Sequence, residues 1–226
     1  MRKNTRSRRD IILWMAQFGI LLAIEALVCF VPFLGSIPVG PLVATLAMIP
    51  VIITAILLGT KAGTLMGFFA GLFSFIVWTF MPPGPTAFVF TPFAEPGNIF
   101  SLVICFVPRI LTGTFTGLSH QAFKKIFAGK KFLDVFQYGI SAVIGSLTNT
   151  VLVLLGIMVF FGPEFFQTVQ GDAYSLKGLL LAILFIFATN GLPEAFVSFV
   201  LSFAVSKPVN DYLLKPITVQ EIHRVL

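Results

Sequence analysis

The stretch of sequence that decides the fold is SLVICFVPRILTGTFTG, residues 101–117. It is apolar, it is long enough as a helix to reach the middle of a membrane, and it carries one arginine, Arg109, near its centre. An arginine at bilayer depth costs at least about 2.5 to 3.5 kcal/mol, so it usually has a partner. The polar and small side chains that share a helix face with Arg109 are Cys105, Thr112, Gly113 and Thr116. This face is predicted to point into protein rather than lipid.

The composition is that of an integral membrane protein. Of the 226 residues, 57% are hydrophobic and only 11% are charged, and the mean hydropathy is +0.99. A soluble core cannot absorb so much apolar surface. The net charge of +6 does not indicate nucleic-acid binding, because the basic residues lie at the ends of apolar segments, next to lipid headgroups. No linker interrupts these segments, so we expect one integral membrane domain over residues 1–226.

Six apolar segments are predicted to be transmembrane helices, at about residues 11–31, 42–58, 62–80, 99–121, 133–161 and 177–206. The second is expected to bend at Pro50. A cleaved signal peptide is the alternative for the first segment, but that segment is long, contains Glu25 and lacks a small-residue cleavage site after it. The predicted fold class is therefore all-α, a single bundle of six transmembrane helices.

Two connecting segments are predicted to be external loops. Residues 81–98 contain five prolines and neither Lys nor Arg, which rules out a spanning helix. Three phenylalanines, Phe88, Phe90 and Phe93, make this loop apolar, so we expect it to fold over the bundle as a cap. Residues 162–176 form the second external loop.

The distribution of basic residues predicts the orientation of the bundle. The N-terminus, the turn at Lys61, the loop at 124–131 and the C-terminal tail hold 13 of the 15 Lys and Arg residues. The exceptions are Arg109 and Lys177. Under the positive-inside rule both termini are cytoplasmic.

Four glycines recur at every fourth position in and before the third predicted helix: Gly59, Gly63, Gly67 and Gly71. Small residues at this spacing let a neighbouring helix approach closely, which is how membrane helices pack. We therefore expect tight packing at this ladder.

Five polar residues lie inside the predicted spans: Glu25, Arg109, Asn149, Asn190 and Glu194. Counted at about 1.5 Å per residue from each helix start, Arg109 lies near mid-depth, Glu25 and Asn149 lie in the outer half, and Asn190 lies slightly inward of Arg109. Three or four of the five could meet around one pocket. Arg109 either forms an ion pair with Glu194 or Glu25 that pins the bundle, or faces a cavity and receives a carboxylate or carbonyl ligand. The cavity is the favoured hypothesis. For Asn149 and Asn190 an inter-helix hydrogen bond is an open alternative.

Motifs of soluble enzymes are absent from the sequence. The run GTKAG at Gly59 lacks the spacing of a Walker A loop, and the two histidines are isolated. Cys29 and Cys105 have no metal-ligand spacing and are expected to be inert. We therefore expect no enzymatic activity, no cofactor and no metal site.

The first predicted helix has a strip of small residues on one side: Ala16, Gly19, Ala23 and Ala26. Glu25 lies roughly opposite Ala16 on the helical wheel. This arrangement suits a helix between a partner protein and a pocket, although packing within the same bundle would also explain it.

Several runs resemble the substrate-binding S components of energy-coupling factor (ECF) vitamin transporters. They are SIPVGPLVATLAMIPVIITAILLGTKAGTLMGFFAGLFSF, FVFTPF, VPRILTG and GSLTNT, and together they cover most of the chain. The resemblance implies a multi-pass protein of the cell membrane that binds a vitamin from outside. It also implies a transmembrane coupling subunit and two cytoplasmic ATPase subunits as partners, with cargo released by toppling in the membrane.

The resemblance also implies roles for single residues. The family docks its coupling subunit through an AxxxA-like motif on the first helix, but position 20 is Ile here, so Gly19 and Ala23 are the nearest equivalent. The docking residues are therefore expected among Ala16, Gly19, Ala23 and Ala26. The expected ligand-binding residues are Arg109, Asn149, Asn190, Glu194, Phe88 and Phe90. The expected cargo is pantothenate, and the alternative cargoes are other small vitamins such as riboflavin, folate or pyridoxine.

Two other functions remain to be considered. A self-sufficient secondary transporter of a small anionic metabolite would require ion-coupling acids in broken helices and an internal repeat, and no convincing repeat relates the two halves. A membrane scaffold without a ligand would bind no small molecule specifically.

Overall fold

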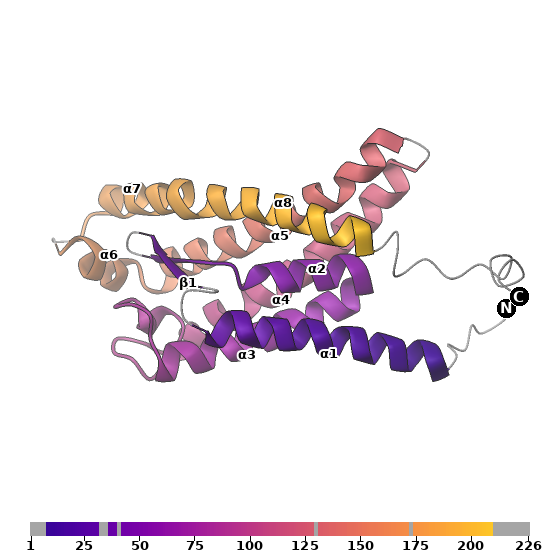
Figure 1. Ribbon diagram of the computed structural model, residues 1–226. Helices are drawn as coiled ribbons and strands as arrows, with labels where there is room; N and C mark the ends of the chain where they lie inside the picture. Colours follow the sequence, from indigo (N-terminus) through magenta and orange to yellow (C-terminus); the bar gives the residue numbers. More distant parts are fainter. Residues whose placement is uncertain (1–7, 32–35, 40–41, 129–130, 172–173, 210–226) are drawn as a thin grey trace, which may run out of the picture.

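The computed structural model describes residues 8–31, 36–39, 42–128, 131–171 and 174–209, which form a bundle of long helices (Figure 1). The helices are α1 (Arg8–Phe30), α2 (Met48–Leu58), α3 (Thr60–Phe80), α4 (Ile99–Ile126), α5 (Lys131–Phe160), α6 (Gly162–Gln170), α7 (Leu176–Ile186) and α8 (Leu192–Pro208). A short π-helix, η2 (Phe187–Gly191), joins α7 to α8. The predicted helical bundle is thereby confirmed.

Five segments in the described part of the chain are long and apolar enough to cross a membrane: Ile11–Phe30, Thr60–Phe80, Ile99–Ile126, Phe136–Phe160 and Leu176–Pro208. They correspond to five of the six predicted spans. The last runs continuously through α7, η2 and α8. Apolar sequence of this length forms helices in lipid because only a helix satisfies all its backbone groups internally.

The second predicted span is wrong at its beginning. Residues Leu42–Thr45 form a strand, β2, that pairs antiparallel with β1 (Ser36–Val39), and α2 begins only at Met48. Two prolines at 38 and 41 and several β-branched residues favour extended backbone there. With 11 residues, α2 spans only about 16 Å, too short to cross a bilayer alone. Pro50 lies in its first turn, where a missing N–H costs little, so the predicted bend is not needed.

The second predicted external loop also contains a helix that the sequence analysis missed. Within residues 162–176, α6 begins at Gly162 with a proline in its first turn and buries Phe165 and Phe166. The strong amphipathic pattern of this segment could have revealed it, because its apolar residues recur at helical spacing. The fourth predicted helix likewise ends later than expected, at Ile126 instead of residue 121.

The loop at residues 81–98 folds into the bundle, as predicted for a cap. Phe88 and Phe90 are 2% and 5% exposed; Phe88 lies within a short 3-10 helix, η1 (Ala87–Val89), and Phe90 directly follows it. The hydroxyl of Ser101 at the start of α4 donates to the Phe88 carbonyl at 2.6 Å, which ties the loop to that helix. Phe93 differs from its two neighbours, since it is 76% exposed.

The glycine ladder brings α3 and α4 into backbone contact. A Cβ at Gly67 would meet the carbonyl oxygen of Arg109, and one at Gly63 would lie 2.8 Å from the carbonyl oxygen of Gly113. Gly71 packs against Phe106. The expected tight packing is confirmed at these three positions. Gly59 has another role, because its φ of +92° favours glycine in the turn between α2 and α3.

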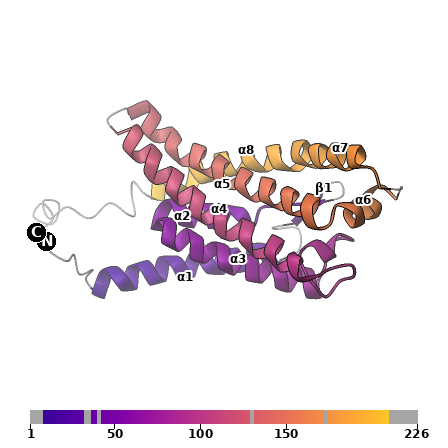
Figure 2. The same cartoon turned by 180° about the vertical axis from the view of Figure 1, so that it is seen from behind.

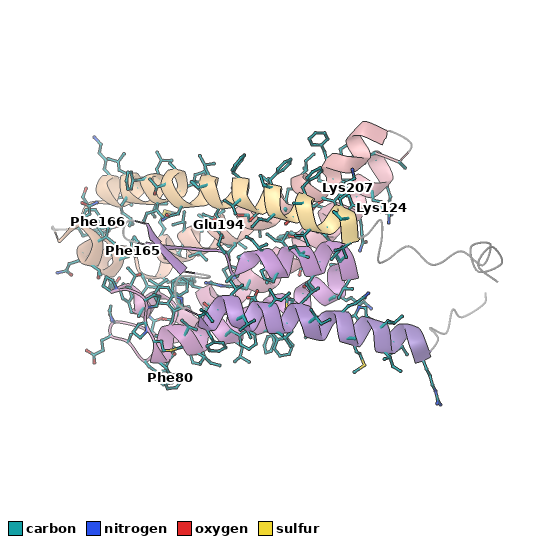
Figure 3. The ribbon with its side chains drawn as sticks, viewed as in Figure 1. Phe80, Lys124, Phe165, Phe166, Glu194 and Lys207 are labelled. Atoms are coloured by element: carbon teal, nitrogen blue, oxygen red, sulfur yellow. The ribbon has the colours of Figure 1, made fainter. Side chains whose placement is uncertain are left out.

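Basic side chains gather at one end of the bundle. The first residues of α1, the turn between α2 and α3, and the last residues of α4 and α8 all lie at this end (Figures 1 and 2). Figure 3 shows Lys124 and Lys207 there, whereas Phe80, Phe165 and Phe166 lie toward the opposite end. The end that carries the cap loop and α6 is therefore the less basic one.

The contact between α3 and the Arg109 backbone makes a first prediction. Gly67→Ala is expected to lower the free energy of unfolding by about 1 to 3 kcal/mol, because a methyl group would collide with a backbone carbonyl that cannot rotate away. Thermal melting of the detergent-purified protein measures this. Gly84→Ala is the matched control, since nothing lies within 4 Å of its added Cβ. Equal melting temperatures for both variants would contradict the packing described here.

Candidate functional site

A cavity of about 90 Å³ lies inside the bundle, with walls from α3, α4, α5 and the η2–α8 region. Most of its surface is apolar and includes Trp78, Val153 and Ile186. Its polar lining brings together four residues of the predicted intramembrane polar set: Arg109, Asn149, Asn190 and Glu194. A mainly apolar cavity with a few converging polar groups is the usual form of a small-molecule site.

The orientation of Arg109 follows from the proline that precedes it. Pro108 has no N–H, so the carbonyl of Ile104 has no donor within α4. Nη1 of Arg109 donates to this carbonyl at 2.8 Å, and the Phe90 ring lies 4.9 Å from the guanidinium carbon. Arg109 is 3% exposed, and its Nε has no hydrogen-bond partner. One nitrogen and one face are therefore held in place, while donors remain for a ligand.

The structure does not contain the ion pair that would make Arg109 a simple helix pin. Within the described residues, no carboxylate oxygen lies within 4.0 Å of its nitrogens. Glu194 is 8% exposed and its Oε1 has no partner. Glu25 is fully buried beside the cavity, where Oε1 accepts from the Cys29 thiol at 3.3 Å and Oε2 has no partner.

Two asparagines face the cavity without the inter-helix hydrogen bonds that were the alternative. Oδ1 of Asn149 and both amide atoms of Asn190 have no partner, and the two residues are 5% and 6% exposed. The π-helix η2 ends just before Pro193, and it places Asn190 and Glu194 one turn apart on the same wall. Leaving a buried polar group unsatisfied costs about 1 to 3 kcal/mol, which a bound ligand or water can offset. Such π-helical turns occur often at functional sites.

The cap loop contributes one of its two buried phenylalanines to the cavity. Phe90 lines it and packs on Trp78, with ring centroids 4.7 Å apart. Phe88, also predicted to bind ligand, instead packs edge-on against Phe161 at 5.6 Å in the apolar core and does not line the cavity. Phe88 therefore supports the cap from behind.

Sequence analysis missed other lining residues, among them Trp78, Ser74 and Cys29. Trp78 has a signal in the sequence, because it is an aromatic residue at the end of a span just before the proline-rich loop. Cys29, expected to be an inert core residue, is half-buried, packs against the hydrophobic core and also lines the cavity. Cys105 is buried and donates to the Gly71 carbonyl at 3.4 Å, as a core residue does.

A comparison with protein families gives the cavity its context. The family model described as "ECF transporter, substrate-specific component" matches residues 14–206. The chain belongs to this family. It is 33% identical over 210 residues to the pantothenic acid transporter PanT of Lactococcus lactis, covering 91% of this chain and 94% of that protein. It is 32% identical over 150 residues to the pantothenate transporter PanT of Leuconostoc mesenteroides, covering 62% and 65%.

Membership of the family confirms the resemblance seen in the sequence. With five helices able to span a bilayer, this substrate-specific component is a multi-pass membrane protein. The family description places it among transport proteins and not among enzymes.

The small-residue strip of this substrate-specific component is turned away from the bundle. Ala16, Gly19 and Ala23 are exposed and Ala26 is half-buried. An added Cβ at Gly19 would meet nothing within 4 Å. Packing within the same bundle therefore does not account for the strip, while Glu25 on the other side of α1 is buried.

The two phenylalanines of the cap loop provide a matched test of the site's lid. Phe90→Ala is expected to lower the free energy of unfolding by about 3 kcal/mol, the low end for a buried phenylalanine, because one side of its ring already faces a cavity. Phe93→Ala, at 76% exposure in the same loop, is expected to change it by less than about 0.5 kcal/mol. Thermal melting of both variants measures the change in stability. An effect of Phe93→Ala as large as that of Phe90→Ala would contradict the assignment of Phe90 as the buried residue of the cap loop.

Proposed function

We propose that the chain is the pantothenate-binding subunit of an ATP-driven ECF importer and that its cargo occupies the Arg109 cavity. The observation that carries this proposal is one buried guanidinium that faces a cavity and has no carboxylate partner among the described residues. A planar fork of donors suits a carboxylate, which it can bind through two parallel hydrogen bonds. The names of the two relatives support pantothenate as that carboxylate.

The rest of the lining fits the rest of this cargo. Pantothenate carries one carboxylate, one amide and two hydroxyls on a branched apolar skeleton. Asn149, Asn190 and Glu194 offer hydrogen-bonding groups, and Trp78 and Phe90 offer apolar surface. Riboflavin and pyridoxine have no carboxylate for the guanidinium, and folate has two, so each of these vitamins fits the charge of the cavity less well.

The proposed direction of transport is inward. The concentration of basic side chains at one end of the bundle supports cytoplasmic termini under the positive-inside rule. The cap loop and α6 then face the outside, where they can admit the vitamin to the cavity.

Energy for transport comes, in this proposal, from other subunits. A transmembrane coupling subunit docks on α1, and two cytoplasmic ATPases drive release. The exposed strip of Ala16, Gly19 and Ala23 supports this, because small residues let a partner helix approach closely. Ala26, half-buried at the end of the strip, completes the proposed docking face.

Removing the guanidinium tests the cargo site. Arg109→Gln is expected to weaken pantothenate binding by about 2 to 5 kcal/mol, the range for truncating one partner of a buried charged pair. The affinity of Arg109→Lys for pantothenate is expected to lie between those of wild type and Arg109→Gln, since a point charge cannot make the bidentate contact. Isothermal titration of the purified protein measures this. Panthenol, which has a hydroxyl in place of the carboxylate, is the control ligand and should bind both proteins equally weakly. Wild-type affinity in a folded Arg109→Gln protein would remove Arg109 from the site.

Thiol labelling tests the orientation. Both native cysteines are first replaced, as Cys29→Ser and Cys105→Ala, and single cysteines are then added to this background. The cysteine of Ala128→Cys is expected to be shielded from a membrane-impermeant thiol reagent in intact cells. One in the Gln170→Cys protein is expected to react, because residue 170 lies at the end with few basic residues. Labelling at residue 128 from outside would reverse the topology and the direction of import.

Enlarging the strip on α1 tests energy coupling. Ala23→Leu or Gly19→Leu is expected to abolish uptake by the assembled transporter while pantothenate binding to the isolated subunit survives. Ala204→Leu, the same kind of change on the exposed face of α8, is the control and should transport normally. Undiminished uptake by the isolated subunit in liposomes without ATP would instead favour a secondary transporter.

A further inference from the structure

One basic and one acidic side chain, each able to carry a charge, line the cavity from different helices. Arg109 lies on α4, which packs against α3, α5 and α2, whereas Glu194 lies on α8, which packs mainly against α5 and α2. Both residues line the cavity, yet no ion pair forms between them. Each charge is therefore available to a different part of the same ligand.

The cavity can pair with one negatively charged group of a ligand. Arg109 is the single basic residue among the described residues that line it. Its Nη1 already donates to the Ile104 carbonyl, and the Phe90 ring covers one face of the guanidinium. One carboxylate therefore uses the donors that remain. A second acidic group would find no cation in a site of low dielectric, where unpaired charge is costly.

The cavity lining also contains hydrogen-bonding side chains without partners, which come from α5, η2 and α8. Glu194, Asn149 and Asn190 are each more than nine-tenths buried and each keeps at least one unpartnered polar atom. The hydroxyl of Thr150, which also lines the cavity, is already used by the Ser146 carbonyl at 3.2 Å. The three unpartnered side chains are thus available to the groups of a ligand that do not bind Arg109.

We propose that Glu194, flanked by Asn149 and Asn190, restricts the cargo to monoanions. Its carboxyl group accepts hydrogen bonds from neutral hydroxyl or amide groups and excludes a second acidic group such as a phosphate. This inference rests on the proposed function, because it takes the carboxylate of the cargo to bind Arg109. Rejection of unwanted ligands by like charge is a common means of specificity.

The test compares three ligands on the purified full-length protein by isothermal titration. They are pantothenate, pantothenate phosphorylated on its terminal hydroxyl, and pantothenate acetylated there as a neutral ligand of similar bulk. Wild type is expected to bind the phosphorylated form at least about 100-fold more weakly than the acetylated one, since like charges in a buried site cost several kcal/mol. Glu194→Gln is expected to narrow this ratio by about 10-fold or more. Asn190→Asp, which adds a carboxyl group to the same wall, is expected to widen it.

Ser198→Ala is the matched control. Ser198 is one turn beyond Glu194 on α8 and fully buried, but does not line the cavity, so the ratio is expected to stay at its wild-type value. An unchanged ratio in both Glu194→Gln and Asn190→Asp would overturn the inference, as would equal rejection of the acetylated form, which would indicate steric exclusion. Failure of pantothenate itself to bind wild type would instead overturn the proposed function. If Glu194→Gln does not fold, the Asn190→Asp result decides.

Discussion

The fold of this protein depends on holding one arginine inside a membrane. The cost of Arg109 is reduced by its own helix, because Pro108 releases the Ile104 carbonyl and Nη1 of the next residue takes it. A proline that would be a defect in a soluble helix is here the source of an acceptor at the right depth. The Phe90 ring adds a cation–π contact at 4.9 Å. These two contacts leave some N–H donors of the guanidinium without a partner. The buried arginine can therefore also bind a ligand.

The surrounding structure keeps that group in place. Glycines 63 and 67 bring α3 against the backbone of α4 at the level of Arg109, so the helix that carries the arginine has little freedom to rotate. The cap loop is tied to the start of α4 through Ser101 and places Phe90 over the guanidinium. The π-helix η2 and the start of α8 bring Asn190 and Glu194 to the same cavity. Close helix packing and an irregular helix thus produce a site lined by one arginine, one glutamate and two asparagines.

Much of this arrangement was predictable, because bilayer length and positive charge at helix ends leave strong patterns in a sequence. Five spans, the buried cap loop and the tight glycine packing followed from such patterns. The short α2 and the β1–β2 hairpin did not, since the apolar run at residues 42–58 resembles a span when only hydropathy is counted, whereas Leu42–Thr45 form a strand. α6 was missed because its one proline and its polar residues suggested a loop.

The candidate site was partly predictable for a different reason. Charged and amide residues inside apolar helices stand out in a sequence, so Arg109, Asn149, Asn190 and Glu194 were found. Which phenylalanine faces the cavity depends on how a loop folds, and local pattern could not separate Phe90 from Phe88. Apolar lining residues such as Val153 and Ile186 resemble ordinary core residues until the fold is known. Ion pairing between Arg109 and the two glutamates was equally undecidable, since it depends on distances between helices.

The central claim is that this cavity holds a carboxylate vitamin on Arg109. The most direct measurement is mass spectrometry of the small molecules released from detergent-purified protein produced in rich medium. The account predicts pantothenate at about one molecule per protein in wild type and its loss from a folded Arg109→Gln protein. Release of a vitamin without a carboxylate, or retention of the same ligand by Arg109→Gln, would contradict it.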